Sequence, residues 1–551
     1  MRWRKIETLR TDSTRSEASL ELRNFLAKFP ADGFPNRFAP PDNQYGNDVD
    51  ATINSGLNLN RHGFDHWTNV SSLKGGAMSL HGCFSGLLIV VSCTGWAFAQ
   101  SDAEADKLKS EAGTAYERGE FAKCLELTTR VLAQNPKDHA ALYLRASSHV
   151  ELGVARRDGK ELRLGIEDAR ESLRAGGSNE INYYLPYMYG MTSLANLEGR
   201  KEHAEVVMQV GQSVLSRTTL TAEQRANILY QRAAAYVHLK NVDAALQDYQ
   251  AAIKSFPGHL GSHVGLAESH VVAGQFDKAL VAFTSAVDTF PNNPLVFNNR
   301  GLFLQQQGKL KDAMADFNKA LQLDPKFAVA YTNRGFTHQA ERNLTAAEAD
   351  YSEAIRLDAA NPLFHSLRGT CRLSQLNTAG AIEDYGQAIQ LDPQNPVAHA
   401  DLGFAKYFAR DYGGALTAFD QAGSMHASMR YLNPWRAWVV VLSGKLDALA
   451  PILEATTKRP EADRDWIDQL VLFLNGKISE QELVKAVEKA TDVNLKNAQL
   501  CEAYYFIGER RLQAGDKTNA IVFYQQVLKT NAVQLSAYRG AQFALQAAGV
   551  R

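Results

Sequence analysis

Five histidines in the middle of the chain are the first residues whose type and spacing could support chemistry. His263 and His270 are seven residues apart, which places them on one face of a helix, and His338, His365 and His399 follow. Imidazole nitrogens are common metal ligands, but no carboxylate or cysteine falls with these histidines at ligand spacing. We therefore expect semi-buried rings that pack between helices, and we predict no metal and no other cofactor.

Motifs that would carry catalysis are missing from the sequence. It contains no Ser/His/Asp arrangement, no glycine-rich phosphate loop and no His-Glu-x-x-His segment. We therefore predict no catalytic residues and a protein that is not an enzyme.

The elements that would position the histidines come from an internal repeat of six consecutive 34-residue blocks, running from Ala226 to about Met429. Position 8 of each block is Gly or Ala, positions 20 and 27 are Ala, and position 24 is aromatic. The residues at position 8 are Ala233, Ala267, Gly301, Gly335, Gly369 and Gly403, and those at position 24 are Tyr249, Phe283, Phe317, Tyr351, Tyr385 and Phe419. Small side chains let two helices approach closely, and the aromatic ring fills the remaining space. Most blocks end in Pro, which terminates the second helix.

This pattern resembles the tetratricopeptide repeat (TPR), in which each unit is a pair of antiparallel helices. The resemblance implies an all-α, right-handed superhelical solenoid with a concave groove that binds partners. We expect about nine helix-pair repeats, with a non-TPR helical insert before the last one.

The groove would be lined by positions 2, 5, 9 and 12 of each block. Residues predicted to bind a partner are Asn298, Gln305, Thr332, Phe336, Gln339, Thr370, Phe404 and Tyr407. Among all the inward positions only Glu268 is charged. Amides and hydroxyls among aromatic rings suit an extended peptide, whose backbone needs donors and acceptors. The alternative is that these positions face solvent and bind nothing.

An alternative ligand for this groove is the C-terminal carboxylate of a partner, which some TPRs bind in a carboxylate clamp. Tyr331-Thr332-Asn333-Arg334 resembles the asparagine-bearing helix of TPRs that grip the C-termini of chaperones. The clamp also needs cations on the neighbouring helices, where this chain has Leu302, Leu363 and Leu367. A bound carboxylate would be left unpaired, which excludes the clamp.

Positions 7 and 23 of the blocks vary together. Four blocks have Arg at position 7 and Asp at position 23, and the other two have Leu and Ala. The charged pairs are Arg232 with Asp248, Arg300 with Asp316, Arg334 with Asp350, and Arg368 with Asp384. The apolar pairs are Leu266 with Ala282 and Leu402 with Ala418. We predict four structural salt bridges between the two helices of a repeat, against the alternative of unrelated surface charges.

Composition sets limits on the class of protein. The chain has 551 residues, 45% of them hydrophobic and 22% charged, with a formal net charge of −1. This balance gives no support for binding nucleic acid or an anionic membrane surface. Of the five cysteines, Cys124, Cys371 and Cys501 are isolated, and we expect them to be small residues in or near the core.

Residues 82–99 form the only long apolar run, which begins a few residues after Met78 and ends in Ala97-Phe98-Ala99. This small-x-small ending is the pattern that signal peptidase cleaves. We therefore expect residues 78–99 to be a signal peptide, and residues 1–77 to be a wrongly assigned start or disordered.

Two alternatives to plain secretion stay open. Val90-Val91-Ser92-Cys93 resembles a lipobox, which would make Cys93 a lipidation site. The run could also stay uncleaved as a membrane anchor, for which its length is barely enough. All three place residues 100–551 outside the cytoplasm, in the periplasm or cell envelope.

The rest of the chain divides by how closely it follows the repeat. Residues 105–216 fit degenerate TPRs, residues 226–429 are the six regular repeats, residues 430–500 are helical but not TPR, and residues 501–551 fit a terminal TPR with a capping helix. Within the third segment Ser479-x-x-Glu482 predicts a capping box.

From Pro434 onward the chain resembles the C-terminal half of the NlpI-type TPR lipoproteins of diderm bacteria. The residues that carry this resemblance are Trp466, Leu474 to Gln481, Glu502 to Gly508, Gly515-Asp516, Ala520 and Tyr538-Arg539-x-Ala541. The resemblance implies an envelope scaffold that docks peptidoglycan hydrolases and a periplasmic protease.

The sequence thus predicts a secreted or envelope-tethered scaffold that binds other proteins or extended peptides in a groove, with no nucleic acid. The alternative is a regulatory subunit or adaptor for a peptidase or a peptidoglycan hydrolase.

Overall fold

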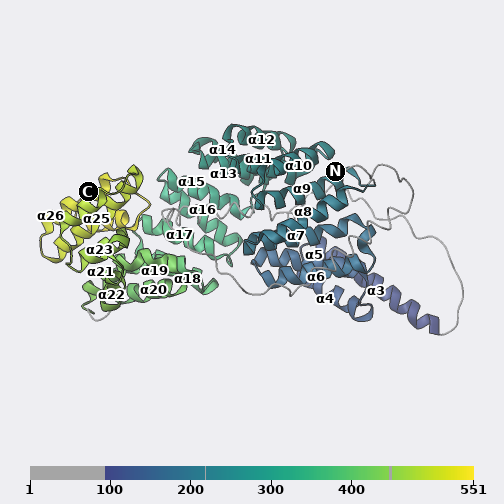
Figure 1. Cartoon of the computed structure of the whole chain (residues 1–551), viewed down its shortest axis with the longest axis horizontal. Helices are drawn as coiled ribbons and strands as arrows, with labels where there is room; N and C mark the ends of the chain where they lie inside the picture. Colours follow the sequence, from purple (N-terminus) through teal and green to yellow (C-terminus); the bar gives the residue numbers. More distant parts are fainter. Residues whose placement is uncertain (1–93, 218, 446–448, 551) are drawn as a thin grey trace, which may run out of the picture. The chain divides into compact units, whose positions relative to one another are not determined.

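The structure is a computed structural model that describes residues 94–550, apart from residue 218 and residues 446–448. Side chains are described from residue 103 onward. Every described secondary-structure element is a helix, which confirms the predicted all-α class (Figure 1). Residues 1–93, including Met78 and Cys93, lie outside the described residues, and the last residues of the predicted signal peptide form the start of helix α3.

The chain forms two compact units that meet between Asn299 and Arg300, a division that the repeat pattern did not predict. The helices of the first unit are α3 (Thr94–Glu117), α4 (Phe121–Gln134), α5 (His139–Arg156), α6 (Gly159–Arg174), α7 (Tyr184–Glu198), α8 (Lys201–Leu215), α9 (Ala222–His238), α10 (Val242–Ser255), α11 (Leu260–Val272) and α12 (Phe276–Thr289). Short 3₁₀ helices at Gly177–Asn179 and Ile181–Tyr183 precede α7, and α13 (Pro294–Gln306) contains the boundary.

The second unit continues the same alternation and then departs from it. Its paired helices are α14 (Leu310–Leu323), α15 (Ala328–Ala340), α16 (Leu344–Leu357), α17 (Pro362–Ser374), α18 (Thr378–Leu391), α19 (Pro396–Phe408) and α20 (Tyr412–Met425). A 3₁₀ helix (Ala427–Leu432), α21 (Asn433–Ser443), α22 (Ala450–Thr457), a second 3₁₀ helix (Glu461–Asp463), α23 (Trp466–Leu474) and α24 (Glu480–Val487) follow. The chain then forms α25 (Val493–Gln513), α26 (Lys517–Lys529) and α27 (Ser536–Ala547).

The turn inside each regular repeat has one fixed feature. Position 15 has a positive φ in all six repeats, at Lys240, Gly274, Gly308, Arg342, Leu376 and Arg410. Only two of these are Gly, so four repeats hold a side chain in the left-handed region that L-residues disfavour. In four repeats the side chain of position 16 then caps the second helix, as Asn343 does by accepting from the N–H of Ala346. These two features fix the reversal between the paired helices.

Close approach of the two helices depends on the small residue at position 8. A Cβ atom added to Gly335 would lie 2.9 Å from the ring of Tyr351, and one added to Gly403 would lie 2.4 Å from the ring of Phe419. Both rings are fully buried, as is Ala347 at position 20. In the repeats with Gly at position 8 the missing Cβ lets the ring pack directly on the first helix, whereas the repeats with Ala233 and Ala267 accommodate one.

The segment after the regular repeats folds around its aromatic residues. Trp435 and Trp438 of α21 are buried in one cluster with Tyr505 and Phe506 of α25. The predicted capping box at the start of α24 is confirmed, since Ser479 and Glu482 exchange backbone-to-side-chain hydrogen bonds of 2.7 and 3.2 Å. Residues 430–500 therefore form part of the hydrophobic core rather than a linker.

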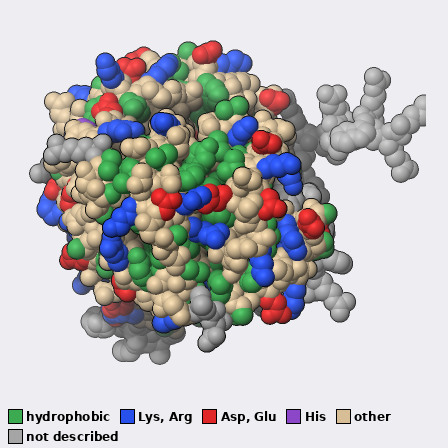
Figure 2. Space-filling model, turned by 90° about the vertical axis from the view of Figure 1, so that its left-hand side faces the viewer, with side chains coloured by type: hydrophobic (Ala, Val, Ile, Leu, Met, Phe, Trp, Pro, Cys, Tyr) green, Lys and Arg blue, Asp and Glu red, His purple; other side chains and the backbone are tan. Residues whose placement is uncertain are grey.

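The surface mixes hydrophobic and charged side chains. A view from the end of the chain where α25 and α26 lie shows hydrophobic side chains interspersed with charges of both signs (Figure 2). Within the described part of the chain, no helix has the length and apolar character needed to cross a bilayer.

A substitution in α16 tests the helix packing. Ala347→Leu adds side-chain volume to a fully buried contact and should lower the free energy of unfolding by roughly 1–3 kcal/mol. The matched control is Ala349→Leu, which makes the same change at an exposed position of the same helix and should cost little. Urea denaturation of both variants measures the difference, and equal losses would show that the helix faces have been assigned wrongly.

Candidate functional site

Half of the residues predicted to line the groove are buried, which corrects the expectation that they face an open surface. Asn298, Thr332, Phe404 and Tyr407 are each at most 5% exposed. They therefore contribute to packing between helices. Two different parts of the chain cover them.

The first reason concerns position 5 of the repeat, which Asn298 and Thr332 occupy. At this position in the first repeat, the ring of Tyr230 lies 3.0 Å from a Cβ added to Gly261, which is position 2 of the next repeat. In the first repeat the side chain at position 5 is thus covered by the first turn of the following repeat. Thr332 also donates its hydroxyl to the carbonyl of Ala328 in its own helix.

The second reason concerns Phe404 and Tyr407 of α19, which the C-terminal helices cover. Trp435 of α21 packs edge-to-face on both rings, at centroid distances of 5.0 and 5.4 Å. The Tyr407 hydroxyl donates to Glu509 of α25 at 2.8 Å and lies 2.9 Å from the hydroxyl of Tyr505. The face of the last regular repeat is therefore occupied by the chain's own C-terminal segment.

Glu509 organises this covered region. Its carboxylate accepts hydrogen bonds from Tyr407 of α19, from the indole N–H of Trp438 at 3.0 Å and from the Tyr524 hydroxyl at 2.7 Å. The carboxylate thus joins α19, α21 and α26 to α25 within the second unit. Sequence periodicity could not reveal it, because Tyr407 and Glu509 are separated by 102 residues.

The other four predicted groove residues are half-buried, and three have polar partners. Gln305 of α13 donates to the Asn333 carbonyl and to the Thr337 hydroxyl at 2.7 Å, and so ties α13 to α15. Gln339 accepts from Tyr351 at 3.2 Å, and Thr370 lies 2.9 Å from the hydroxyl of Tyr385. Phe336 is the apolar member of this row and is partly open to solvent.

The four Arg–Asp pairs lie between the two helices of their repeats. In three of them both oxygens of the Asp accept from Nε and Nη2 of the Arg, at 2.6 to 2.9 Å. Arg368 binds Asp384 through the same two nitrogens at 2.6 to 3.2 Å. All four Asp residues are at most 7% exposed, so each guanidinium neutralises a buried carboxylate.

Three of these arginines also reach the preceding repeat. Arg334 donates to Asn318 at 2.8 Å, Arg368 to Ser352 at 3.3 Å, and Arg232 to Gln212 at 2.6 Å. Each acceptor lies on the second helix of the repeat before. The arginine at position 7 therefore stabilises the stacking of repeats as well as the pairing of helices, which the sequence pattern alone did not indicate.

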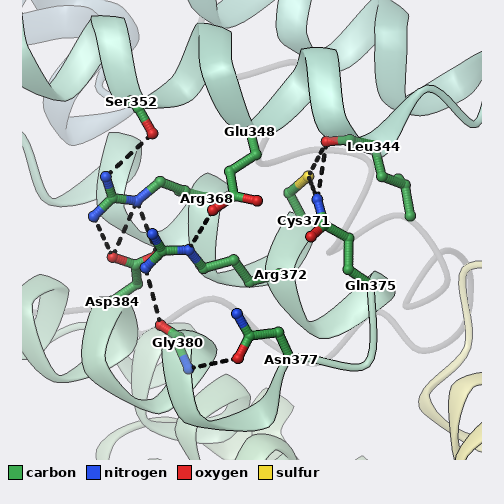
Figure 3. A network of polar contacts seen from close by, with 10 residues as sticks. All are labelled: Leu344, Glu348, Ser352, Arg368, Cys371, Arg372, Gln375, Asn377, Gly380 and Asp384. Atoms are coloured by element: carbon green, nitrogen blue, oxygen red, sulfur yellow. Dashed lines mark hydrogen bonds and ion pairs between the residues drawn. The ribbon is translucent and has the colours of Figure 1, made fainter.

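The fifth repeat has the most extensive network (Figure 3). Asp384 accepts from Arg368 and also from Arg372 at 3.0 Å, and Arg372 donates to Glu348 of α16 at 2.8 Å. Hydrogen bonding to Arg372 lowers the pKa of Glu348. Nearby, the buried thiol of Cys371 lies 3.3 Å from the Leu344 carbonyl, and burial raises its pKa to about 11. A thiol with that pKa is a core group rather than a nucleophile.

A fifth pair of the same kind occurs in an irregular repeat. Arg145 of α5 donates to both oxygens of Asp168 in α6 at 2.7 Å. The pair escapes the sequence pattern because 23 residues separate its members, against 16 in the regular repeats. Longer paired helices, with 18 residues in α5 against 13 in α15, move the Asp along the chain while the contact is kept.

The histidines bind backbone carbonyls and neighbouring side chains. His263, His365 and His399, at position 4, each place Nε2 at 3.0 to 3.1 Å from a carbonyl six residues earlier. His270 contacts Gln275 at 2.9 Å. No cluster of three or more His, Cys, Asp or Glu that could hold a metal occurs among the residues that the structure describes. The three histidines at position 4 thus stabilise the turn that precedes their own helices.

Comparison with known families decides the classification. Profiles of the tetratricopeptide repeat match residues 224–298, 294–327 and 328–361, and a profile described as TPR repeat matches residues 377–407. The chain is a tetratricopeptide-repeat protein. Stacked repeats of this family form protein-interaction scaffolds, which sets the general role of the protein. The matched ranges contain three of the four Arg–Asp pairs, and Arg368 and Gly369 lie between two of the ranges.

Several solved TPR structures are similar to part of the chain. A crystal structure of MamA is 24% identical and covers 29% of this chain and 94% of its own, with a TM-score of 0.28. PilF of Pseudomonas aeruginosa is 18% identical and covers 37% of this chain and 94% of its own, with a TM-score of 0.34. YrrB, described as a TPR protein with an unusual peptide-binding site, is 18% identical and covers 35% of this chain and 96% of its own, with a TM-score of 0.27.

A double-mutant cycle at Arg334 and Asp350 tests the energetic role of the pairs. Arg334→Leu leaves the buried carboxylate of Asp350 without its cation and should cost about 3 kcal/mol of unfolding free energy. Arg334→Leu with Asp350→Ala reproduces the apolar pair of the second and sixth repeats and should recover much of that loss. Strictly additive effects in urea denaturation would contradict this account.

The matched control for this cycle is Arg356→Leu in α16. Arg356 pairs with Glu353 at 2.6 Å, but its side chain is 65% exposed. An exposed pair contributes at most about 1 kcal/mol. A loss at Arg356 as large as that at Arg334 would show that burial does not determine the cost.

Proposed function

We propose that this TPR protein is an exported scaffold that binds extended peptide segments of partner proteins on the first helices of its regular repeats. The observation that carries the proposal is the row formed by Phe336, Gln339 and Thr370 on α15 and α17, which is half-buried and uncharged. A partly open aromatic ring beside amide and hydroxyl groups can hold both the side chains and the backbone of a peptide.

The arrangement of hydrogen bonds supports this assignment. Gln339 and Thr370 are each oriented by a buried tyrosine hydroxyl from the second helix, Tyr351 and Tyr385. Side chains held in one orientation lose less conformational entropy when a ligand binds than freely rotating ones do. The tyrosine at position 24 thus fixes the orientation of a polar side chain on the first helix before a partner binds.

Export is supported by the sequence of the leader. The apolar run at residues 82–99 with its Ala97-Phe98-Ala99 ending has the features of a signal peptide, and Cys93 offers the alternative of a lipid anchor. Either form would place the repeats in the periplasm or cell envelope.

A regulatory subunit for a peptidase or peptidoglycan hydrolase is the second candidate. The segment that resembles NlpI-type lipoproteins lines an open cavity of about 570 Å³, with Lys477, Ser479 and Arg510 in its wall. Glu480 and Arg511 form an ion pair of 2.7 Å at the same place, which holds α24 to α25. A surface of this kind could dock an enzyme apart from the peptide row. Capture of a hydrolase or protease from envelope extracts would favour this candidate.

Removing the Phe336 ring tests the peptide row. Phe336→Ala should weaken capture of partners from envelope extracts while the thermal unfolding temperature changes little, because the ring is partly open to solvent. Leu391→Ala on α18 is the control, since it removes an exposed apolar side chain (42% exposed) from a second helix. Unchanged capture by Phe336→Ala, or equal loss in both variants, would count against the proposed surface.

The N-terminus of the mature protein tests export. Protein purified from the envelope should begin at Gln100 or at lipidated Cys93, because the leader is removed at one of these two places. Peptide mass spectrometry that recovered residues 1–77 from the mature protein would rule this out.

A further inference from the structure

Glu268 of α11 stands out as an acidic side chain without a partner. It occupies position 9 of the second regular repeat, within the first of the two units, and it is half-buried. The carboxylate forms no hydrogen bond or ion pair with any residue that the structure describes. Burial raises its pKa to about 8. A carboxyl group held in this way is costly to ionise unless a cation approaches it.

The terminal repeat shows how the fold satisfies the same position. Glu509 is position 9 of its repeat and accepts from Tyr524, the position-24 residue of the same repeat, at 2.7 Å. In the repeat of Glu268, position 24 is Phe283, which has no hydroxyl to donate. The donor that would pair with Glu268 inside the repeat is therefore missing.

A second polar group near Glu268 is also unsatisfied. The hydroxyl of Tyr249 in α10 is buried and has no hydrogen-bond partner in the described part of the chain. Tyr351 and Tyr385 bond to positions 12 and 9 of their own first helices, but Tyr249 meets Ala234 and Val237 at those positions. Its ring lies against Gly265, one turn before Glu268, and the charge of Glu268 raises the pKa of Tyr249 further.

The second unit has another half-buried acid on a first helix, and an arginine from elsewhere in the chain acts on it through its charge. Asp401 of α19 is also half-buried, and burial raises its pKa to about 6, while Arg539 of α27 acts to lower it. Beside it, Phe543 of α27 stacks on Phe408 of α19 at a centroid distance of 4.7 Å. A helix from elsewhere in the chain thus brings an arginine and an aromatic ring to a first helix.

We propose that Glu268 is a binding position for an arginine or lysine side chain of an extended partner peptide. The inference rests on the proposed function and names the chemistry of one residue of the partner. Both side chains fit this position, because each supplies N–H donors and a positive charge to a carboxylate that has no donor of its own.

Binding of a cationic side chain would convert an unsatisfied carboxyl into a charge-assisted pair. The contact is formed in a partly dehydrated place, where such hydrogen bonds are stronger than on an open surface. Glu268 would therefore favour peptides that have a cationic residue at one place over peptides that lack it, rather than raise the affinity for all peptides.

Selection of phage-displayed random peptides on the full chain tests the proposal. Peptides enriched on the wild type should share an Arg or Lys at one fixed position, and changing that residue to Gln should weaken binding about tenfold or more. On Glu268→Gln the same change should have almost no effect, since the variant keeps the side-chain shape but cannot ionise. Fluorescence anisotropy with the labelled peptides measures each affinity.

Two further variants separate a specific contact from a general charge effect. Asp277→Asn removes an exposed acid from α12 and should leave the preference for a cation intact. Phe283→Tyr supplies the hydroxyl that Glu509 receives from Tyr524, and should weaken binding of the cationic peptides by giving Glu268 an internal donor.

The outcomes distinguish this inference from the proposed function. Enriched peptides without a fixed cation, or an equal loss on wild type and Glu268→Gln, would overturn the role of Glu268 and leave the peptide-binding scaffold standing. Failure to enrich any peptide on the wild type would overturn both.

Discussion

The contact between a small residue of one helix and a buried aromatic ring of the next is the constraint on which the rest of the structure depends. At Gly335 and Gly508 an added Cβ would lie within 3 Å of the facing tyrosine ring, so the two helices can pair only without it. The same contact directs the tyrosine hydroxyl to the far side of the first helix. There it meets Gln339 in one repeat and Glu509 in another. Packing of the core therefore determines how polar groups of the first helices are oriented.

Ion pairs stabilise the contact between helices, whereas aromatic and amide groups lie on the opposite side of the first helices. The Arg–Asp pairs are confined to the seam between helices, where Arg334 and Arg368 also reach the preceding repeat. The first helices carry almost no charge on the opposite side, apart from Glu268. A seam held by ion pairs leaves the other face free of structural charges, and that face can then recognise a partner by aromatic and amide groups.

Much of this could be predicted from the sequence, because a period of 34 residues repeats every local contact. The partners of Arg232 and Arg334 follow from co-variation of two positions. The fate of Phe404 and Tyr407 could not be predicted in the same way, because Trp435 and Glu509 cover them from outside the repeat. Arg145 and Asp168 were missed because the longer helices of their repeat change the spacing between them. The unsatisfied state of Glu268 becomes visible only when the position-24 residue of each repeat is compared in space.

Hydrogen–deuterium exchange of the full chain, with and without a saturating selected peptide, tests the central claim that first helices bind and seams stabilise. The account predicts that the peptide slows exchange in the first helices that it contacts, while the second helices α12, α16 and α18 change little. Added protection confined to the second helices, or spread equally over both helices of each repeat, would contradict it.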